Sequence, residues 1–427
     1  MVKVYIQTYG CSANLNDAEI MAGLLEKSGF LIVTIPEIAD IIIVNTCIVK
    51  SKTQTKMYKV IRDLAKKYPH KKLIIAGCLP QVKLELPVNN VSLIGPHNIK
   101  DIVKVVDSSI KGKNIELIDK DKQVKLMLPK ISKNPVVNIV QILEGCNGNC
   151  SYCIVKQAKP VLFSFPEELI LKEVKAGLKS NAKEVWITSQ DNAAYGLENN
   201  KNSKLPELLK SIDKIQGKFL VRVGMMNPNN IIPVLDELIN SYKSEKIFKF
   251  LHIPVQSGND EILELMNRKY KVKDFKKIVN EFRKQIPEIT ISTDIICGFP
   301  SETEQQFTDS LSLIKEIKPD VLNISRFGAR PGTLAEKMPK QVHGSTTKER
   351  STKLTNLFNK IALEKNRSWI GWKGTILFDE IGKNNTLIGR NFAYKPVVVK
   401  ADNNLLGKFV NVEIKEASPY DLRAILK

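Results

Sequence analysis

The sequence has no long apolar run, few histidines and an odd number of cysteines. Its apolar runs near residues 41–44 and 73–76 are far too short to cross a membrane, so we expect no membrane partner. The first residues, MVKVYIQTYG, contain neither the basic region nor the apolar segment of an export signal. We therefore expect a cytoplasmic protein. Its seven cysteines should remain reduced, because disulfides are rare in the cytosol and an odd number of thiols cannot all pair.

The scarcity of histidine limits the metal sites that the chain can build. Only four histidines occur, and none lies near the densest group of cysteines. They are His70, His97, His252 and His343. A closed structural zinc site needs four ligands, so zinc is a weak interpretation of a group of three thiols.

Acidic residues are also few. The chain has 45 Asp and Glu against 65 Lys and Arg, which gives a net charge of +20. This excess favours a polyanionic partner, with nucleic acid as the leading candidate. The alternative is a lysine-rich proteome that places solvated lysines on every surface. A length of 427 residues and 43% hydrophobic content suit two or three domains with ordinary cores.

Three cysteines lie within eight residues of one another. Cys146, Cys150 and Cys153 occur in GCNGNCSYC, on a loop rich in Gly and Asn. Such a loop can wrap a compact metal–sulfide cube. A four-iron cube that is held by three thiolates keeps one iron free, so this spacing indicates a catalytic centre.

Three further cysteines each follow an apolar, β-branched run. VKVYIQTYGC, ADIIIVNTC and KLIIAGC end at Cys11, Cys47 and Cys78, and helical patterns lie between them. This order predicts a βαβαβ unit with parallel strands, whose carboxyl ends meet at one edge of the sheet. The sequence therefore predicts a second site of three thiolates, although three buried core thiols are an alternative. For Cys297, in TDIICGFP, we expect simple burial.

The chain divides into three parts. Residues 1–110 form the first α/β unit, and the lysine-rich residues 111–134 form a linker. Over 135–366, six strand-like runs alternate with amphipathic helices, which predicts a partial (β/α)6 parallel barrel with one open side. Its last stretch, 337–367, is a basic helical bridge. Residues 367–427 contain short strands between Gly and Asn turns, which predicts a small, OB-like β-barrel.

One loop of the C-terminal part combines a cation, an amide and two aromatic rings. Arg390, Asn391, Phe392 and Tyr394 have the chemistry that nucleotide stacking requires. The alternative is that both rings simply cap the barrel.

Several of these motifs resemble a known family. The spacing C-x3-C-x2-C after a first barrel strand, with Tyr152 before the last cysteine, resembles the radical S-adenosylmethionine superfamily. The runs YGCSANLNDAE, NTC, AGC, HIPVQSG, TDIICGFPSET and RFGARPGT resemble its methylthiotransferases, and residues 367–427 resemble a TRAM domain. RVGMMNP, QDNAAYG and GRNFAYKPVVV are most similar to the archaeal and eukaryotic tRNA enzymes that act on threonylcarbamoyladenosine.

The resemblance implies two [4Fe-4S] clusters and S-adenosylmethionine as cofactors. One cluster, on Cys146, Cys150 and Cys153, cleaves S-adenosylmethionine to a deoxyadenosyl radical. The other, on Cys11, Cys47 and Cys78, supplies or carries the sulfur that enters carbon 2 of the adenine next to the anticodon (position 37). The implied partners are tRNA, an electron donor and a sulfur source, and the sequence does not identify the last two.

The resemblance also implies contacts to S-adenosylmethionine at successive strand ends. Tyr152 would lie behind the adenine. The other implied contacts are Ser189, Gln190, Asp191, Arg222, His252, Gln256, Thr293, Asp294 and Gly298. For Thr293, Asp294 and Gly298, capping or barrel packing is an equal alternative.

Three polar residues of the first unit, Asn14, Asp17 and Glu19, match the family's CxxNxxDxE pattern, although Asp17 could merely cap the following helix. Two features depart from the family. Lys159 is followed by proline where glycine is common, and Ser189 replaces a frequent glycine.

Two other functions remain open from the sequence. The chain could act as a methylthiotransferase on a ribosomal protein side chain, as a sister branch of the family does. It could also be a non-catalytic iron–sulfur protein that binds RNA or senses redox state. Formation of deoxyadenosine and the nucleoside content of tRNA distinguish these functions.

Overall fold

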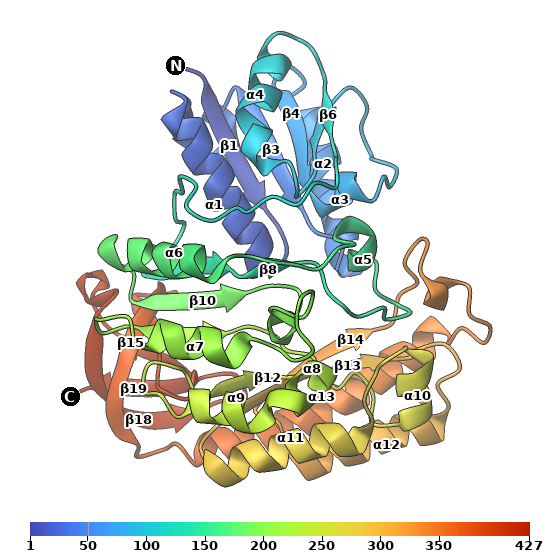
Figure 1. Cartoon of the computed structure of the whole chain (residues 1–427), viewed down its shortest axis with the longest axis vertical. Coiled ribbons are helices and arrows are strands. Elements are labelled where there is room, and N and C mark those ends of the chain that lie inside the picture. Colours follow the sequence, from blue (N-terminus) through green and yellow to red (C-terminus); the bar gives the residue numbers. More distant parts are fainter. Residues whose placement is uncertain (50) are drawn as a thin grey trace.

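The computed structural model describes residues 1–49 and 51–427. An upper α/β domain stands on a central barrel, and a second, smaller barrel lies at the lower left (Figure 1). The predicted mixed α/β class is confirmed by the parallel strands of the first two parts and the closed β-barrel of the third. Among the described residues, no helix combines the length and the apolar character that a membrane span requires.

The N-terminal domain contains a six-stranded parallel sheet in the order β2-β1-β3-β4-β5-β6. Its strands are β1 (Lys3–Thr8), β2 (Leu31–Val33), β3 (Ile41–Thr46), β4 (Lys72–Gly77), β5 (Ser92–Ile94) and β6 (Glu116–Leu117). Its helices are α1 (Ser12–Lys27), α2 (Ser51–Lys67), α3 (Cys78–Gln81) and α4 (Ile102–Ile110). Every residue of β3 is buried, as expected for a central parallel strand covered on both faces. The predicted βαβαβ order is confirmed.

The segment 111–134 packs against both neighbouring domains. It contributes β6 to the first sheet, and its Lys125 and Leu126 are buried. This segment therefore helps to hold the N-terminal domain in place against the barrel.

The central part is a half-open barrel of six parallel strands. Its strands are β7 (Val137–Gln141), β10 (Glu184–Thr188), β11 (Leu220–Val223), β12 (Phe250–His252), β13 (Thr290–Cys297) and β14 (Val321–Arg326). They form two sheets, β7-β10-β11 and β12-β13-β14. Hydrogen bonds join the sheets, because Met226 N donates to His252 O at 3.0 Å and Val221 N donates to Lys246 O at 2.7 Å. The predicted six-repeat barrel is confirmed.

Amphipathic helices cover the outside of the barrel. They are α6 (Glu167–Lys179), α7 (Leu205–Asp213), α9 (Leu235–Tyr242), α11 (Val272–Gln285), α12 (Glu304–Ile317) and α13 (Gly344–Arg367), with shorter helices α5 (Val155–Ala158), α8 (Pro228–Ile231) and α10 (Asp260–Leu265). The antiparallel pair β8 (Leu143–Glu144) and β9 (Phe163–Ser164) frames the cysteine loop. The predicted basic helix begins at Gly344, seven residues later than its pattern at 337.

The C-terminal part is a closed five-stranded barrel in the order β15-β16-β17-β19-β18. Its strands are β15 (Lys373–Ile381), β16 (Thr386–Arg390), β17 (Pro396–Lys400), β18 (Phe409–Ala417) and β19 (Leu422–Leu426). Leu387, Val397 and Leu422 are among the apolar side chains that fill its interior. The predicted small β-barrel is confirmed.

The loop between β16 and β17 packs against the floor of the central barrel. The ring of Tyr394 lies 4.7 Å from that of Phe248 and 5.0 Å from that of Phe250. Lys249 N donates a hydrogen bond to Phe392 O at 2.8 Å. The structure therefore gives Tyr394 the capping role, and nucleotide stacking on its ring is wrong because protein rings already occupy that position.

Buried charges lie at the same floor. Glu184, at the start of β10, accepts a hydrogen bond from Trp186 Nε1 at 2.5 Å. Burial is the main cause that raises the pKa of Glu184 to about 8, and Asp379 of the C-terminal barrel adds to the increase. The nearby guanidinium groups of Arg390 and Arg222 oppose it only in part.

This pKa predicts that stability falls as the pH rises. Between the ordinary pKa of 4.5 and about 8, Glu184 is protonated in the folded protein and ionised in the unfolded chain, so folding takes up a proton. Glu184→Gln should therefore raise the melting temperature of the metal-free protein at pH 8 by about 5 °C, and by much less near pH 5. Thermal unfolding across this pH range tests the prediction, with the exposed Glu288→Gln as the control. An equal effect of Glu184→Gln at both pH values would contradict it.

Candidate active site between the N-terminal domain and the barrel

The tight group of cysteines lies on the loop between β8 and α5. Gly148 N donates a hydrogen bond to Cys146 Sγ at 3.2 Å. A Cβ atom on Gly148 would lie 3.3 Å from Cys146 Sγ and 3.8 Å from Cys150 Sγ, so both thiols border the space that this glycine leaves open. Cys153 N donates to Cys150 O at 3.1 Å, which closes the loop on itself. The chain thus brings the thiols to one compact turn.

A polar network from the barrel holds this loop. Arg268 donates from Nη1 to Cys150 Sγ at 3.1 Å and from Nη2 to Asn227 Oδ1 at 2.6 Å. Asn230 and Asn147 exchange two side-chain hydrogen bonds, at 3.0 and 3.1 Å. Backbone contacts add to these, since Ser151 N donates to Met266 O at 3.1 Å. The loop is therefore oriented by side chains that come after β11 and β12.

Asp191 lies at the centre of this network and is fully buried. Its Oδ2 accepts hydrogen bonds from Asn227 Nδ2 and Asn230 Nδ2, both at 2.7 Å, and its Oδ1 accepts from Ala193 N at 3.2 Å. Burial raises the pKa of Asp191, and these hydrogen bonds oppose the increase. Its contacts make Asp191 a support of the cysteine loop.

The second group of cysteines lies at the carboxyl ends of three neighbouring strands. Cys11 directly precedes α1, Cys47 follows β3 and Cys78 begins α3 after β4. Asn14 links the three ends. Its Nδ2 donates to Tyr9 O at 2.9 Å and to Thr46 O at 2.6 Å, and its Oδ1 accepts from Cys78 Sγ at 3.8 Å. The parallel sheet thus brings together thiols that are 36 and 31 residues apart in the sequence.

Gly10 allows Cys11 and Cys47 to approach. Its φ is +110°, and a Cβ atom at this position would lie 2.5 Å from Cys47 Cβ and 2.8 Å from Cys47 Sγ. Only glycine fits both this backbone conformation and this contact. Burial and the neighbouring Cys11 raise the pKa of Cys47 to about 11.

Each cysteine of this group lies beside a contact with the barrel. Ser12, after Cys11, shares a hydrogen bond with Thr188 at the end of β10, with 2.5 Å between the hydroxyl oxygens. Arg330 Nη2 donates to the carbonyl of Ile48, after Cys47, at 2.8 Å. The ends of β1 and β3 that carry Cys11 and Cys47 therefore lie against the barrel.

The third contact joins the two cysteine groups directly. Helix α3, which Cys78 begins, packs against α5, which follows Cys153. Cys78, Leu79, Ile154 and Ala158 belong to one buried apolar cluster. The two cysteine groups are thus connected through adjacent helices of two different domains.

The remaining polar residues of the CxxNxxDxE pattern bind the connecting segment. Asp17 Oδ1 accepts a hydrogen bond from Lys125 Nζ at 3.0 Å, and Glu19 Oε1 accepts from Lys133 N at 3.0 Å. Asp17 lies inside α1, beyond its first turn. The alternative that Asp17 caps this helix is therefore wrong.

The donor sets fit iron–sulfur clusters. Each group supplies three Cys thiols, and cubane clusters are held by Cys thiolates. Burial raises the pKa of Cys146 to about 12, with a further increase from Asp191, so binding of metal must displace protons from neutral thiols.

Several expected cofactor contacts lie around the cysteine loop. Gln190 Oε1 accepts a hydrogen bond from Gly145 N at 2.9 Å, and the hydroxyl of Ser189 is buried without a partner among the described residues. The ring of Tyr152 lies edge-on to Phe299 at 6.3 Å. A ligand would satisfy the free hydrogen-bonding capacity of the Ser189 hydroxyl.

His252 at the end of β12, Asp294 within β13 and Gln256 lie together. His252 Nε2 lies 3.3 Å from both carboxylate oxygens of Asp294, and Asn323 Nδ2 donates to Asp294 Oδ1 at 2.6 Å. The side chains of His252 and Asp294 are 17% and 24% exposed, so a ligand can reach them. Gln256 has a φ of +71°, and its N donates to Asp294 O at 2.8 Å.

Two other expected contacts have packing roles. Thr293 is buried, and its Oγ1 donates to Ile253 O at 2.7 Å and accepts from Val255 N at 3.0 Å. The guanidinium of Arg222 lies 5.3 Å from the ring of Trp186 and 5.4 Å from that of Tyr394 at the barrel floor. Thr293 therefore follows its packing alternative, and Arg222 lies away from the edge that carries the cysteine loop.

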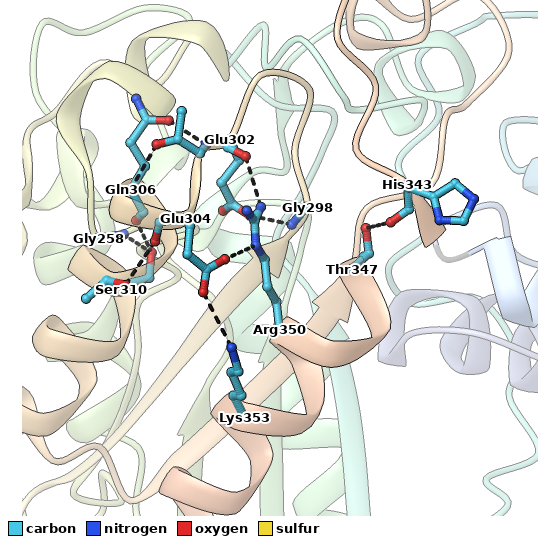
Figure 2. A network of polar contacts seen from close by, with 12 residues as sticks. Gly258, Gly298, Glu302, Glu304, Gln306, Ser310, His343, Thr347, Arg350 and Lys353 are labelled. Atoms are coloured by element: carbon cyan, nitrogen blue, oxygen red, sulfur yellow. Dashed lines mark hydrogen bonds and ion pairs between the residues drawn. The ribbon is translucent and has the colours of Figure 1, made fainter. Parts of the chain in front are cut away.

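Gly298 belongs to a turn that α13 supports (Figure 2). Its φ is +74°, and its N donates to Glu302 Oε2 at 2.7 Å, which also accepts from Arg350 Nη1 at 2.8 Å. The side chain of Thr347 occupies the place where a Cβ atom would lie. The same turn places Phe299 against Tyr152. Cys297 is fully buried, as expected.

Local sequence patterns did not indicate four further site residues: Arg268, Asn227, Asn230 and Arg330. Arg330 lies in RFGARPGT and Asn227 in RVGMMNP, two runs that carry the family resemblance. Their position inside these runs was a signal of function, but only the fold shows which atom each side chain contacts.

Comparisons with known proteins agree with this arrangement. The family model described as "Uncharacterized protein family UPF0004" matches residues 3–91, the radical SAM superfamily matches residues 140–314 and the TRAM domain matches residues 369–427. The methyltransferase TsrM from Kitasatospora setae, a solved radical S-adenosylmethionine enzyme, has a TM-score of 0.57 at 12% identity and covers 79% of this chain and 75% of its own.

The chain is thus a radical SAM protein, a class that implies S-adenosylmethionine and a [4Fe-4S] cluster. The Pyrococcus horikoshii "Probable threonylcarbamoyladenosine tRNA methylthiotransferase" is 42% identical over 98% of both chains. The Homo sapiens threonylcarbamoyladenosine tRNA methylthiotransferase is 35% identical over 99% of this chain and 73% of its own. The chain belongs to the threonylcarbamoyladenosine tRNA methylthiotransferase family.

The contact of Arg268 with Cys150 predicts a role in metal retention. Arg268→Met removes a charge-assisted hydrogen bond to sulfur, an interaction of about 1.5–3 kcal/mol, so a chelator should release iron from this loop about tenfold faster. Release is measured spectroscopically in protein whose Cys11, Cys47 and Cys78 are replaced by alanine. Arg283→Met, which removes a guanidinium on the outer helix α11, is the control. Equal release rates in all three proteins would show that the contact has no such role.

Proposed function

We propose that this protein inserts a methylthio group at carbon 2 of threonylcarbamoyladenosine at position 37 of tRNA, in a reaction driven by S-adenosylmethionine. Relatives with this printed activity match the chain end to end at 35–42% identity. The structural observation that supports the proposal most strongly is the contact between α3 and α5, which brings two three-thiol sites together.

The target bond makes radical chemistry necessary. A hydrogen on an aromatic carbon has no useful acidity near neutral pH, so general acid–base catalysis cannot remove it. A [4Fe-4S] cluster, when bound, supplies the electron that cleaves S-adenosylmethionine to a deoxyadenosyl radical. The protein's part is to hold the reacting groups together and exclude water.

We assign one [4Fe-4S] cluster to each cysteine group. Cys146, Cys150 and Cys153 hold the first, next to S-adenosylmethionine. Cys11, Cys47 and Cys78 hold the second, from which sulfur is transferred. Burial of Cys47 and Cys78 and the contacts of their neighbours with the barrel support this division of roles. An external electron donor and a sulfur source complete the reaction.

The cofactor pocket follows from the same placement. Ser189, with its unpaired buried hydroxyl, and Gln190 are proposed as direct contacts to S-adenosylmethionine, as are the partly exposed His252 and Asp294. Tyr152 and Gln256 border them. Asp191, Thr293 and Gly298 are proposed to shape the pocket through their packing, whereas Arg222 packs at the barrel floor.

We propose four functional parts in the chain. Residues 1–110 bind the sulfur-donating cluster, residues 111–134 connect, residues 135–366 cleave S-adenosylmethionine and residues 367–427 bind RNA. The net charge of +20 supports a nucleic-acid substrate, and the cytoplasm is the proposed place of action.

Replacing the cysteines of the barrel distinguishes the functions of the two sites. Protein with Cys146, Cys150 and Cys153 changed to alanine should form no deoxyadenosine from S-adenosylmethionine and dithionite, because the cluster that cleaves the cofactor has lost its ligands. It should still bind iron at Cys11, Cys47 and Cys78. Iron, sulfide and deoxyadenosine are measured after anaerobic reconstitution, with the buried Cys297→Ala as the control. Loss of all iron would contradict a second cluster.

The nucleoside target has its own test. tRNA from cells that lack the gene should contain threonylcarbamoyladenosine without its methylthio group, as measured by mass spectrometry of nucleosides. An unchanged methylthio-nucleoside pool would overturn the proposed substrate and favour a ribosomal protein side chain.

A further inference from the structure

A compact group of ionisable side chains is buried between the two cysteine sites. Its members come from the N-terminal domain, the connecting segment and the barrel, and each is at most 6% exposed. They are Asp17, His97, Lys125, Glu144 and Lys159, which we name the ionic core. Lys159 is the residue that stands before proline where the family commonly has glycine.

Glu144 is the centre of the ionic core. Its Oε1 accepts hydrogen bonds from Lys125 Nζ at 2.5 Å and from Lys159 Nζ at 2.9 Å. Its Oε2 lies 3.2 Å from His97 Nδ1. Lys125 Nζ also lies 3.0 Å from Asp17 Oδ1. Two lysines thus face two carboxylates, and the lysines hold the pKa of Glu144 well below its usual value despite complete burial.

The ionic core touches the elements that carry both cysteine groups. Glu144 lies two residues before Cys146, and Lys159 follows α5 directly. His97 Nε2 lies 3.0 Å from the carbonyl oxygen of Ala158, the last residue of α5. Asp17 lies on α1, the helix that begins after Cys11. The charge of Lys159 also acts on the thiol of Cys78.

The physical effect of such a core is on geometry more than on net stability. Removing charges from water is costly, and a buried pair often contributes little over an apolar replacement. Breaking one pair, however, leaves an uncompensated charge in the interior, so the partners are strongly held in one arrangement. Here Lys125 of the connecting segment joins Asp17 of the N-terminal domain to Glu144 of the barrel, and His97 of the N-terminal domain contacts Glu144 directly. The preferred arrangement is therefore the docking of one domain on the other.

We infer that the ionic core is a positioning element that sets the separation and orientation of the two cysteine sites. This inference rests on the proposed function, in which sulfur held at one site must reach a substrate radical generated at the other. Asp17, Lys125 and Glu144 touch no reacting atom. They act by holding the N-terminal domain in register with the barrel.

The test uses the ratio of methylthio-nucleoside to deoxyadenosine in reconstituted full-length protein with tRNA. Asp17→Asn keeps the shape of the side chain and removes one charge, and His97→Phe keeps a ring but removes the polar contacts of the N-terminal domain with Glu144 and Ala158. Both variants should still cleave S-adenosylmethionine, whereas methylthio product per deoxyadenosine should fall roughly a hundredfold, the cost of a small misplacement of reacting groups. A purely structural defect lowers both products together and leaves the ratio unchanged.

A second measurement is independent of activity. In the metal-free protein, amide hydrogen exchange of α3 and α5 should be faster in both variants, because the docked state opens more often. Lys67→Met is the matched control, since Lys67 forms an ion pair of the same 3.0 Å length with Glu37 on the exposed surface of the N-terminal domain. Variants with an unchanged ratio and unchanged exchange would overturn the inference. A wild-type protein that forms deoxyadenosine but no methylthio-nucleoside would overturn the proposed function instead, and exchange would then decide the inference alone.

Discussion

The docking of the N-terminal domain on the carboxyl edge of the barrel is the constraint on which the site depends. In the proposed reaction, neither cysteine group alone brings sulfur to a radical. Three contacts, each beside a different cysteine of the N-terminal domain, join the domains: Ser12 with Thr188, Ile48 with Arg330, and α3 with α5. Because parallel strands present their carboxyl ends on one edge, two such edges can face each other across a closed interface.

The C-terminal barrel is held in place at the floor of the central barrel. The ring of Tyr394 packs against the floor of the central barrel, Phe392 O accepts a hydrogen bond from Lys249 N, and Lys395 forms a buried ion pair with Asp320 at 2.9 Å. This loop therefore fixes the position of the C-terminal domain. The helix α13 runs from this domain to the turn of Gly298, where Arg350 holds Glu302 (Figure 2).

The polar residues predicted to contact the cofactor differ in burial and in hydrogen bonding. The side-chain oxygens of Asp191 and Thr293 are engaged with amide and backbone groups, which makes them supports. The hydroxyl of Ser189 is buried with no partner among the described residues, as is Nε of Arg222 at the barrel floor. His252 and Asp294 contact each other and keep part of their surface exposed. A buried polar atom without a partner is costly unless a ligand satisfies it, so the Ser189 hydroxyl, next to Gln190, is a group that a ligand would satisfy.

The sequence by itself determined the elements and the chemistry that they carry. Apolar periodicity predicted the parallel strands before Cys11, Cys47 and Cys78, and the spacing of Cys146, Cys150 and Cys153 predicted a loop for a cluster, because both signals are local. Only the tertiary structure decided that Asp17 pairs with Lys125, that Tyr394 packs on Phe248 and that Arg268 reaches Cys150. These contacts join residues about 100 or more positions apart, and local patterns contain no information about which distant partner a buried charge or ring will meet.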